Sequence, residues 1–242
     1  MKTLPALLST FVVAALPGTA ATLYTGNGNT GFGGEIGNGT LSLDDDGTTI
    51  TATLTKGADP MTDAFVIYID SVAGGFVDTS TISDDGDELR RAASGFDGGA
   101  GNTSTVAFPA GFGADYVISM DADGPNFGGL WSMASGGAFS LPFIDTVNLS
   151  PTGTSVSATY TFSFDLSEIG LSTGDSFNFV ATYLNGNGVF RSDEAFGDGI
   201  ASGNPGFDTV TFTDSLTYNS IPAPSVGLLS LLGALGLLRR RR

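Results

Sequence analysis

The sequence predicts an all-β protein whose body is a single antiparallel β-sandwich of jelly-roll type. Several short segments alternate apolar and polar residues with a period of two, which is the pattern of strands with one buried face. The chain of 242 residues contains 36 glycines, and glycine-rich and turn-rich stretches separate these segments. Many short strands joined by turns favour a sandwich over a β/α fold. A hydrophobic fraction of 41% is enough to form a core.

Two segments show the alternation most clearly. In "SVSATYTFSFDL" and "DSFNFVATY", every second residue is apolar. Each segment therefore predicts a half-buried antiparallel strand. The residues expected on the buried faces are Val156, Ala158, Tyr160, Phe162, Phe164 and Leu166 in the first segment, and Phe177, Phe179, Ala181 and Tyr183 in the second.

The other elements follow from local signals. "TLSLDDDGTTITATL" predicts two strands joined at Asp46 and Gly47, because Asp-Gly accepts the positive φ of a tight hairpin turn. "AFVIYID" is apolar on both faces and predicts a central strand. Further strands are expected in "DYVISM", "GGLWSM" and "DTVTFTDSLTY", and "DLSEIGL" is the only helical turn expected.

The two ends of the chain differ from the body. Residues 1–21 contain Lys2, an apolar stretch and then small residues, which is the layout of a secretory signal peptide. Residues 22–220 form the predicted sandwich domain, and residues 221–242 form a tail with a hydrophobic helix and four terminal arginines. The apolar run 226–238 would be about 20 Å long as a helix, shorter than the roughly 30 Å hydrocarbon core of a bilayer.

The charge distribution excludes several classes of function. All 25 Asp and Glu residues lie between Glu35 and Asp214, and the formal net charge is −16. Such a body repels nucleic acid, so no nucleic-acid partner is expected. The chain has no His and no Cys, which excludes Cys/His zinc sites, His-based triads and thiol nucleophiles.

The acidic loops are candidate metal sites. Asp84, Asp85, Asp87 and Glu88 form the densest set, and calcium prefers several carboxylate and carbonyl oxygens from a turn. The alternative is a solvated turn in which Asp and Gly supply only backbone geometry. No cofactor is otherwise expected, and calcium is the one cofactor that the sequence suggests.

Three further motifs have a structural and a functional interpretation. Trp131, the only tryptophan, lies among glycines and could stack on a sugar, or it could belong to the core. "GNGNTG" matches a dinucleotide-binding pattern, but no helical pattern follows, which favours a tight surface loop. Arg90, Arg91 and Arg191 are scarce cations among acids, and at least one is expected to form a bidentate pair with a carboxylate.

The tail resembles the PEP-CTERM sorting signal of Gram-negative bacteria. The resemblance implies a processing element, a membrane helix and a positively charged stop that stays in the cytoplasm. It departs from the usual pattern at Ala223, where the family most often has Glu. The corresponding residues are Pro222, Ala223 and Pro224 for processing; Val226, Leu228, Leu229, Leu231, Leu232, Leu235, Leu237 and Leu238 for the membrane anchor; and Arg239, Arg240, Arg241 and Arg242 for the stop.

The body is similar in pattern to DOMON-like and family-nine carbohydrate-binding sandwiches. The similarity rests on "NGNTGFGGEIGNGTLSL", "AFVIYIDSVAGGF", "FPAGFGADYVISM", "GGLW", "YTFSFDLSEIGL" and "RSDEAFGDG". Such sandwiches are associated with haem or sugars, and the absence of His disfavours haem here.

These observations predict an exported, non-catalytic protein of the cell surface or extracellular matrix. Its expected partners are the secretion machinery, an exosortase-like processing enzyme, the inner membrane and extracellular polysaccharide. Two alternatives stay open: a carbohydrate-active enzyme that uses paired carboxylates, and a plain single-span envelope protein whose tail is never cut.

Overall fold

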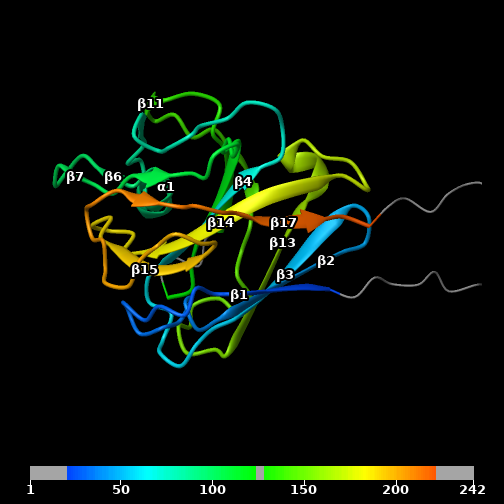
Figure 1. The fold of residues 1–242 in the computed structure, drawn as a ribbon, viewed down its shortest axis with the longest axis horizontal. Coiled ribbons are helices and arrows are strands. Elements are labelled where there is room, and N and C mark those ends of the chain that lie inside the picture. Colours follow the sequence, from blue (N-terminus) through cyan, green and yellow to red (C-terminus); the bar gives the residue numbers. More distant parts are fainter. Residues whose placement is uncertain (1–20, 124–127, 222–242) are drawn as a thin grey trace, which may run out of the picture.

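The computed structural model describes residues 21–123 and 128–221, which form a mostly β structure with antiparallel sheets (Figure 1). A four-stranded sheet, named sheet A, has the order β1-β2-β3-β13. The β2–β3 hairpin turns at Asp46, whose Oδ1 accepts the backbone N–H groups of Thr48 and Thr49 at 2.9 Å each. Gly47 has the positive φ of 91° that this turn requires. The strands are β1 (Thr22–Thr25), β2 (Thr40–Asp45), β3 (Thr49–Thr55) and β13 (Thr159–Asp165).

The larger sheet, named sheet B, has seven strands in the order β12-β10-β9-β4-β14-β15, and β17 also pairs with β14. All of its strand pairs are antiparallel. The strands are β4 (Ala64–Asp70), β9 (Tyr116–Asp121), β10 (Gly128–Ser132), β12 (Phe143–Thr146), β14 (Ser176–Leu184), β15 (Arg191–Phe196) and β17 (Leu216–Asn219).

Short elements join and cover the two sheets. A 3-10 turn, η1 (Leu166–Ile169), confirms the helical turn expected in "DLSEIGL". Two pairs of short strands are parallel, β5 with β11 and β8 with β16, and β6 pairs with β7 in the antiparallel direction. Their bounds are β5 (Ile82–Ser83), β6 (Phe96–Asp97), β7 (Asn102–Thr103), β8 (Val106–Ala107), β11 (Gly137–Ala138) and β16 (Val210–Thr211).

The main core lies between the inner faces of sheets A and B. Phe162 and Phe164 on β13 meet Phe177 and Phe179 on β14, and each of the four side chains is at most 6% exposed. The expected alternation is therefore confirmed from Tyr160 of β13 to Leu166. In β14 the residues expected to be buried, from Phe177 to Tyr183, are buried, but Val180 and Thr182 between them are buried as well, so the expectation of a half-buried strand was wrong there.

The predicted strand around Phe162 was too long at its start. The sequence pattern placed Val156 and Ala158 on the buried face, but β13 begins only at Thr159. Val156 is 72% exposed, and Ala158 is exposed as well. Both residues lie in the irregular segment before the strand, where a period of two no longer determines which side chains are buried.

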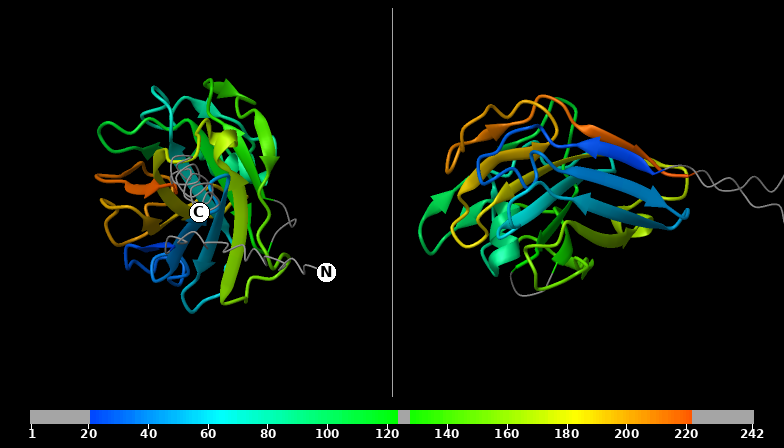
Figure 2. Two further views of the ribbon diagram at one scale, coloured as in Figure 1. Left: turned by 90° about the vertical axis from the view of Figure 1, so that its right-hand side faces the viewer. Right: turned by 90° about the horizontal axis from the view of Figure 1, so that it is seen from below.

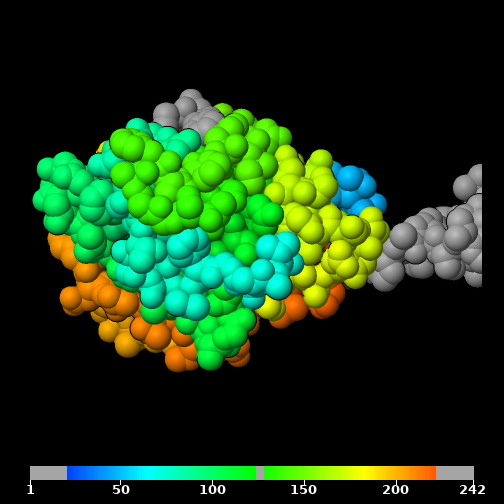
Figure 3. Space-filling model, turned by 90° about the horizontal axis from the view of Figure 1, so that it is seen from above, coloured from blue at the N-terminus to red at the C-terminus, as the bar shows by residue number. Residues whose placement is uncertain are grey.

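The central strands β4 and β9 of sheet B are buried on both faces. β4 lies between β9 and β14, and all of its residues but the last are buried, which confirms the prediction of a central strand. A second apolar cluster covers the outer face of sheet B and includes Leu89 and Ala92 of α1 together with Phe108. Figure 3 shows cyan and green segments as a continuous surface on one side of the molecule.

The helix α1 (Glu88–Ser94) was missed by the sequence analysis, which expected only an acidic loop at this position. Its signals are present in the sequence. Asp87 is the N-cap and accepts the backbone N–H of Arg90, Glu88 lies in the first turn, and Gly95 ends the helix with a φ of 68°. The segment is short and lacks a long apolar period, so caps were its only clear signal.

The two ends of the described chain lie together. Thr22 at the start of β1 pairs with Leu43 of β2, and the backbone N–H of Ile221 donates to Asp45 Oδ2 at 3.0 Å. Tyr24 of β1 also donates to the carbonyl of Thr217 of β17 at 2.7 Å. Figures 1 and 2 show these two strands side by side and running in opposite directions, so that the start of β1 and the end of β17 lie at the same end of the molecule.

The flanking segments predicted from the sequence lie outside the described residues. These are residues 1–20 of the expected signal peptide, and residues 222–242, which contain the processing, anchor and stop residues of the tail. Within residues 21–123 and 128–221, no helix has the length and apolar character needed to cross a membrane.

Candidate functional site

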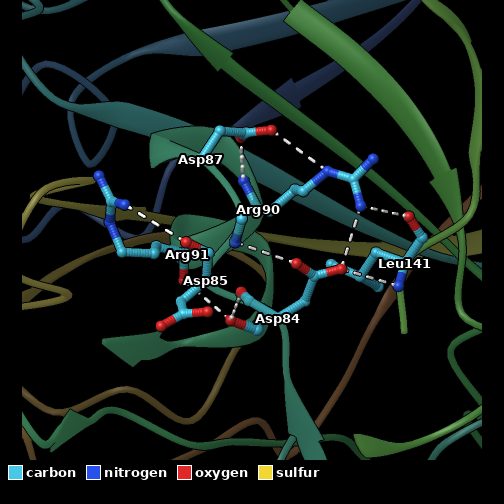
Figure 4. Close-up of polar contacts among 8 residues, drawn as sticks. Asp84, Asp85, Asp87, Arg90, Arg91 and Leu141 are labelled. Carbon is cyan, nitrogen blue, oxygen red and sulfur yellow. Dashed lines mark hydrogen bonds and ion pairs between the residues drawn. The ribbon is translucent and has the colours of Figure 1, made fainter. Parts of the chain in front are cut away.

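The predicted calcium loop is organised around Arg90 (Figure 4). Arg90 Nη1 lies 3.1 Å from Asp84 Oδ2, and Arg90 Nε lies 3.2 Å from Asp87 Oδ2. One guanidinium therefore bridges two carboxylates, whereas the sequence analysis expected a bidentate pair with one. Asp84 is fully buried, and its carboxylate also accepts the backbone N–H groups of Leu141 at 3.0 Å and Gly86 at 3.1 Å.

The four acidic residues of this loop do not converge on one point. Asp87 caps α1, and Glu88 begins the helix. Burial raises the pKa of Glu88, and repulsion by nearby Asp121 adds to the rise. Within the residues that the structure describes, no group of three or more acidic side chains could hold a metal ion. The calcium site predicted from Asp84, Asp85, Asp87 and Glu88 therefore rests on the sequence alone, and the carboxylates of Asp84 and Asp87 pair with Arg90 of α1.

Trp131 does not offer a surface for sugar stacking. It lies on β10 in the cluster that covers the outer face of sheet B, and it is 1% exposed. The Arg90 guanidinium carbon lies 5.9 Å from the centroid of its ring, and Phe143 packs edge-on at 6.1 Å. Of the two interpretations of Trp131, the core residue is confirmed and the sugar-stacking surface was wrong, because sheet B is covered on the face where this side chain lies.

A glycine-rich loop, residues 26–39, folds over the carboxylate of Glu194. Glu194 Oε1 accepts the backbone N–H groups of Phe32 at 2.8 Å and Gly34 at 3.0 Å. Its Oε2 accepts those of Ile36 at 2.8 Å and Gly37 at 3.1 Å. No helix follows the "GNGNTG" motif, which confirms the surface-loop interpretation. Gly37 approaches the loop so closely that a Cβ would lie 1.9 Å from the carbonyl oxygen of Asn29.

Glu35, from the same loop, places a second carboxyl group beside Glu194. Glu35 is 3% exposed, and its Oε2 has no hydrogen-bond partner among the described residues. Burial raises the pKa of Glu35 to about 7, and the nearby charge of Glu194 adds to the rise. Two facing, buried carboxyl groups are the arrangement that a glycosidase-type mechanism would use.

The environment of this pair differs from that of a catalytic dyad. Glu194 is fully buried, and its two carboxylate oxygens are occupied by four backbone N–H groups. Neither Glu35 nor Glu194 lines any of the three surface hollows described below. The pair is therefore placed to hold the glycine-rich loop on β15, and a substrate has no described path to it.

Arg191 is a buried cation without a carboxylate partner among the described residues. Its Nη1 donates to Thr182 Oγ1 at 2.6 Å, and its Nη2 donates to the carbonyl of Ser104 at 3.0 Å. Burial lowers the pKa of the Arg191 guanidinium below its ordinary value. These contacts join β15 to β14 and to the segment before β8, so Arg191 holds elements together.

On the surface formed by residues 21–123 and 128–221, a hollow of about 400 Å³ is built mainly from hydroxyl and amide groups. We call it the hydroxyl groove. It lies where the outer face of sheet A meets the segment that follows β12. None of its lining residues can ionise, and only one of them is apolar. They are Thr51, Thr146, Asn148, Ser150, Thr161, Phe162 and Ser163.

Two other hollows are less suited to a ligand. One, of about 420 Å³, includes Asp115, but Asp115 Oδ2 already accepts the backbone N–H groups of Ser71 and Val72 at 3.0 and 2.9 Å. The other, of about 300 Å³, lies between the loop 199–205 and β16 and is lined by small and aliphatic residues. Neither contains a set of convergent side-chain donors.

Comparison with known protein families, curated proteins and solved structures finds no match for this chain. Neither the Glu35–Glu194 pair nor the hydroxyl groove is apparent from the sequence. Their members are far apart in the chain, and the only local signals were the glycines around Glu35 and the run of alternating Thr and Ser residues on β3 and β13.

Proposed function

We propose that this chain is an exported, non-catalytic protein of the cell surface or extracellular matrix, and that its sandwich domain, of jelly-roll type, binds polysaccharide. In this proposal the signal peptide directs export. The tail from Pro222 to Arg242 holds the chain in the inner membrane until an exosortase-like enzyme cuts it. The protein then reaches the surface or the matrix.

The observation that supports this role best is the position of the two ends of the described chain. β1 and β17 lie side by side, and Ile221 hydrogen-bonds to Asp45 at the end of β2. A tail that continues from Ile221 would leave the domain at the same end at which the signal peptide precedes β1. The rest of the sandwich surface would then face away from the membrane during sorting.

The charge of the chain agrees with this orientation. The four consecutive arginines at 239–242 are costly to move across a bilayer and favour a cytoplasmic end. The acidic body belongs on the opposite side, where its charge keeps it soluble and away from anionic lipid. Pro222 and Pro224 would prevent a membrane helix from continuing into β17 and would leave an extended segment for the processing enzyme.

The enzyme alternative receives less support. It requires two carboxyl groups that flank a substrate. Glu35 and Glu194 face each other, and burial raises the pKa of Glu35 to about 7. Because Glu194 is fully occupied by backbone N–H groups, the pair cannot exchange protons with a substrate without opening the loop. We therefore propose a binding function without catalysis.

Intact-mass measurement of the protein from its native host tests the sorting role. We expect a mature chain that lacks both the signal peptide and residues after the 222–224 segment. A variant with all four terminal arginines changed to serine should accumulate unprocessed or leak from the cell. A matched variant with four lysines keeps the positive stop and should be processed normally. A mature wild-type chain that still ends at Arg242 would overturn sorting in favour of the plain membrane anchor.

A further inference from the structure

We infer that the hydroxyl groove binds a short stretch of a neutral polysaccharide, with Thr161 and Asn148 as its main hydrogen-bonding residues. This inference rests on the proposed function and adds to it a site and a ligand class. The groove volume of about 400 Å³ lies within the roughly 300–1,000 Å³ typical of ligand sites.

The groove is lined by the functional groups that a sugar chain requires. Thr51, Thr161 and Ser163 present hydroxyl groups from the exposed face of sheet A. The hydroxyl of Thr161 donates to the carbonyl of Ser150 at 3.4 Å and so offers its lone pairs to a ligand. The hydroxyls of Thr51 and Ser163 can both donate and accept, which matches the dual character of sugar hydroxyls. A ligand with the same kind of groups can therefore pair with this surface without leaving a charged group buried.

Backbone pairing holds the two sides of the groove in place. The N–H of Ser150 donates to the carbonyl of Thr161, and the N–H of Thr161 donates to the carbonyl of Ser150, each at 2.8 Å. Asn148 Oδ1 accepts the backbone N–H of Gly128 at 3.2 Å. This contact orients the amide and leaves its NH₂ group as the donor that a ligand would meet. The site is therefore largely formed before a ligand arrives, which lowers the entropic cost of binding.

The surrounding charge selects against anionic glycans. Asp165 lies two residues beyond Ser163 on β13, and Glu168 lies beside Asp145 and Asp165. The whole chain has a formal charge of −16. A uronate or sulfated polymer would be repelled by these acids, and no cation lines the groove to offset the repulsion. A neutral chain experiences no such penalty.

Calorimetric titration of the full chain tests this inference. The chain would be purified in a detergent without a sugar headgroup and titrated with maltohexaose, cellohexaose, laminarihexaose and chitohexaose as neutral probes, and with hexagalacturonate as the anionic probe. We expect at least one neutral probe to bind and hexagalacturonate not to bind. Binding is measured on purified protein, so its outcome does not depend on whether the tail is processed in the host.

Two variants of neighbouring residues locate the site. Thr161→Val removes one groove hydroxyl, while Thr159→Val changes the exposed residue two positions earlier on the same face of β13, outside the groove. Valine is favoured in strands, so both variants should fold, which circular dichroism checks. We expect Thr161→Val to weaken binding about threefold to tenfold, the effect of one lost hydrogen bond, and Thr159→Val to leave it unchanged.

A third variant tests the amide. Asn148→Asp keeps the acceptor for Gly128 but replaces the NH₂ donor with a negative charge, and it should weaken binding of the neutral probe at least as much as Thr161→Val. The inference is overturned if none of the neutral probes binds. Equal affinity of wild type, Thr161→Val and Asn148→Asp would also overturn it, as would tighter binding of hexagalacturonate than of every neutral probe.

Discussion

The carboxyl group of Glu35 is buried beside that of Glu194, and both belong to the contact that holds the glycine-rich loop on β15. The two groups have opposite surroundings. Glu194 accepts four backbone N–H groups, which stabilise its charge, whereas Glu35 has an oxygen without a partner. Burial, with the nearby charge of Glu194, therefore favours the protonated form of Glu35 and raises its pKa to about 7.

The first prediction is that Glu35 makes stability depend on pH. Its pKa rises from 4.5 in the unfolded chain to about 7 in the native state. Between these values the native state binds more protons, so stability falls as pH rises through this window. Glu35→Gln cannot ionise and should show a flatter profile. We expect the melting temperatures of the two proteins to be similar below about pH 4.5 and the variant to melt higher above about pH 7. Parallel profiles across this range would contradict the assignment.

Glu194→Gln should have the opposite effect. The amide removes the charge that four backbone N–H groups stabilise. Its NH₂ also replaces an oxygen that accepts two of these donors. We expect a loss of about 1.5–3 kcal/mol in the free energy of unfolding. Denaturant unfolding below pH 5 isolates this loss, because Glu35 is then protonated in both proteins. A variant as stable as wild type at that pH would show that the four N–H contacts contribute little.

A third prediction concerns the buried carboxylate at the start of α1. Asp84→Asn replaces an acceptor of two backbone N–H groups and of Arg90 with an amide that must also donate. Because Arg90 stays partly solvated, we expect destabilisation of about 1–3 kcal/mol in urea unfolding. Asp87→Asn is the matched control, since Asn also caps helices well, and it should cost less. Equal losses in the two variants would argue against a special role for Asp84.

The core gives a fourth prediction. Phe179 is 1% exposed and packs edge-on against Tyr24 with the ring centroids 5.0 Å apart. Phe179→Ala removes this contact and leaves a cavity between the sheets, so we expect a loss of about 3–5 kcal/mol. Val156→Ala, at a residue that is 72% exposed, should change stability by less than about 0.5 kcal/mol. Chemical denaturation of both variants measures the contrast, and a loss below that of Val156→Ala would place Phe179 outside the core.

The fifth prediction addresses calcium at the acidic loop. Arg90 already offsets the charges of Asp84 and Asp87, so a cation bound by either of these carboxylates would have to displace an existing ion pair. A ligand that binds only the native state raises the melting temperature. We expect the melting temperature in chelator to equal the melting temperature in millimolar calcium. A rise in calcium that Asp85→Asn or Asp87→Asn removes would instead support the metal site predicted from the sequence.

Local patterns in the sequence determined most of the fold. The alternation in "TYTFSFD" and "SFNFVATY" predicted β13 and β14, and Asp46-Gly47 predicted the first hairpin. These signals are local because a strand with one buried face must alternate, and because few residues accept a positive φ. The apolar character of "AFVIYID" likewise indicated a strand buried on both faces. The charge distribution and the two terminal segments also come from the sequence alone.

The tertiary structure decided which side chains can meet a ligand. Trp131 is buried because α1 and its neighbouring segments pack on sheet B. No local pattern in the sequence around Trp131 indicates that these segments pack there. Arg90 neutralises the acidic loop because a helix turns its side chain back toward Asp84. Glu35 meets Glu194, and Asn148 meets the groove of Thr51 and Thr161, only after the sheets assemble. Contacts between residues far apart in the chain depend on how strands pair and sheets pack, and periodicity within one segment carries no information on that packing.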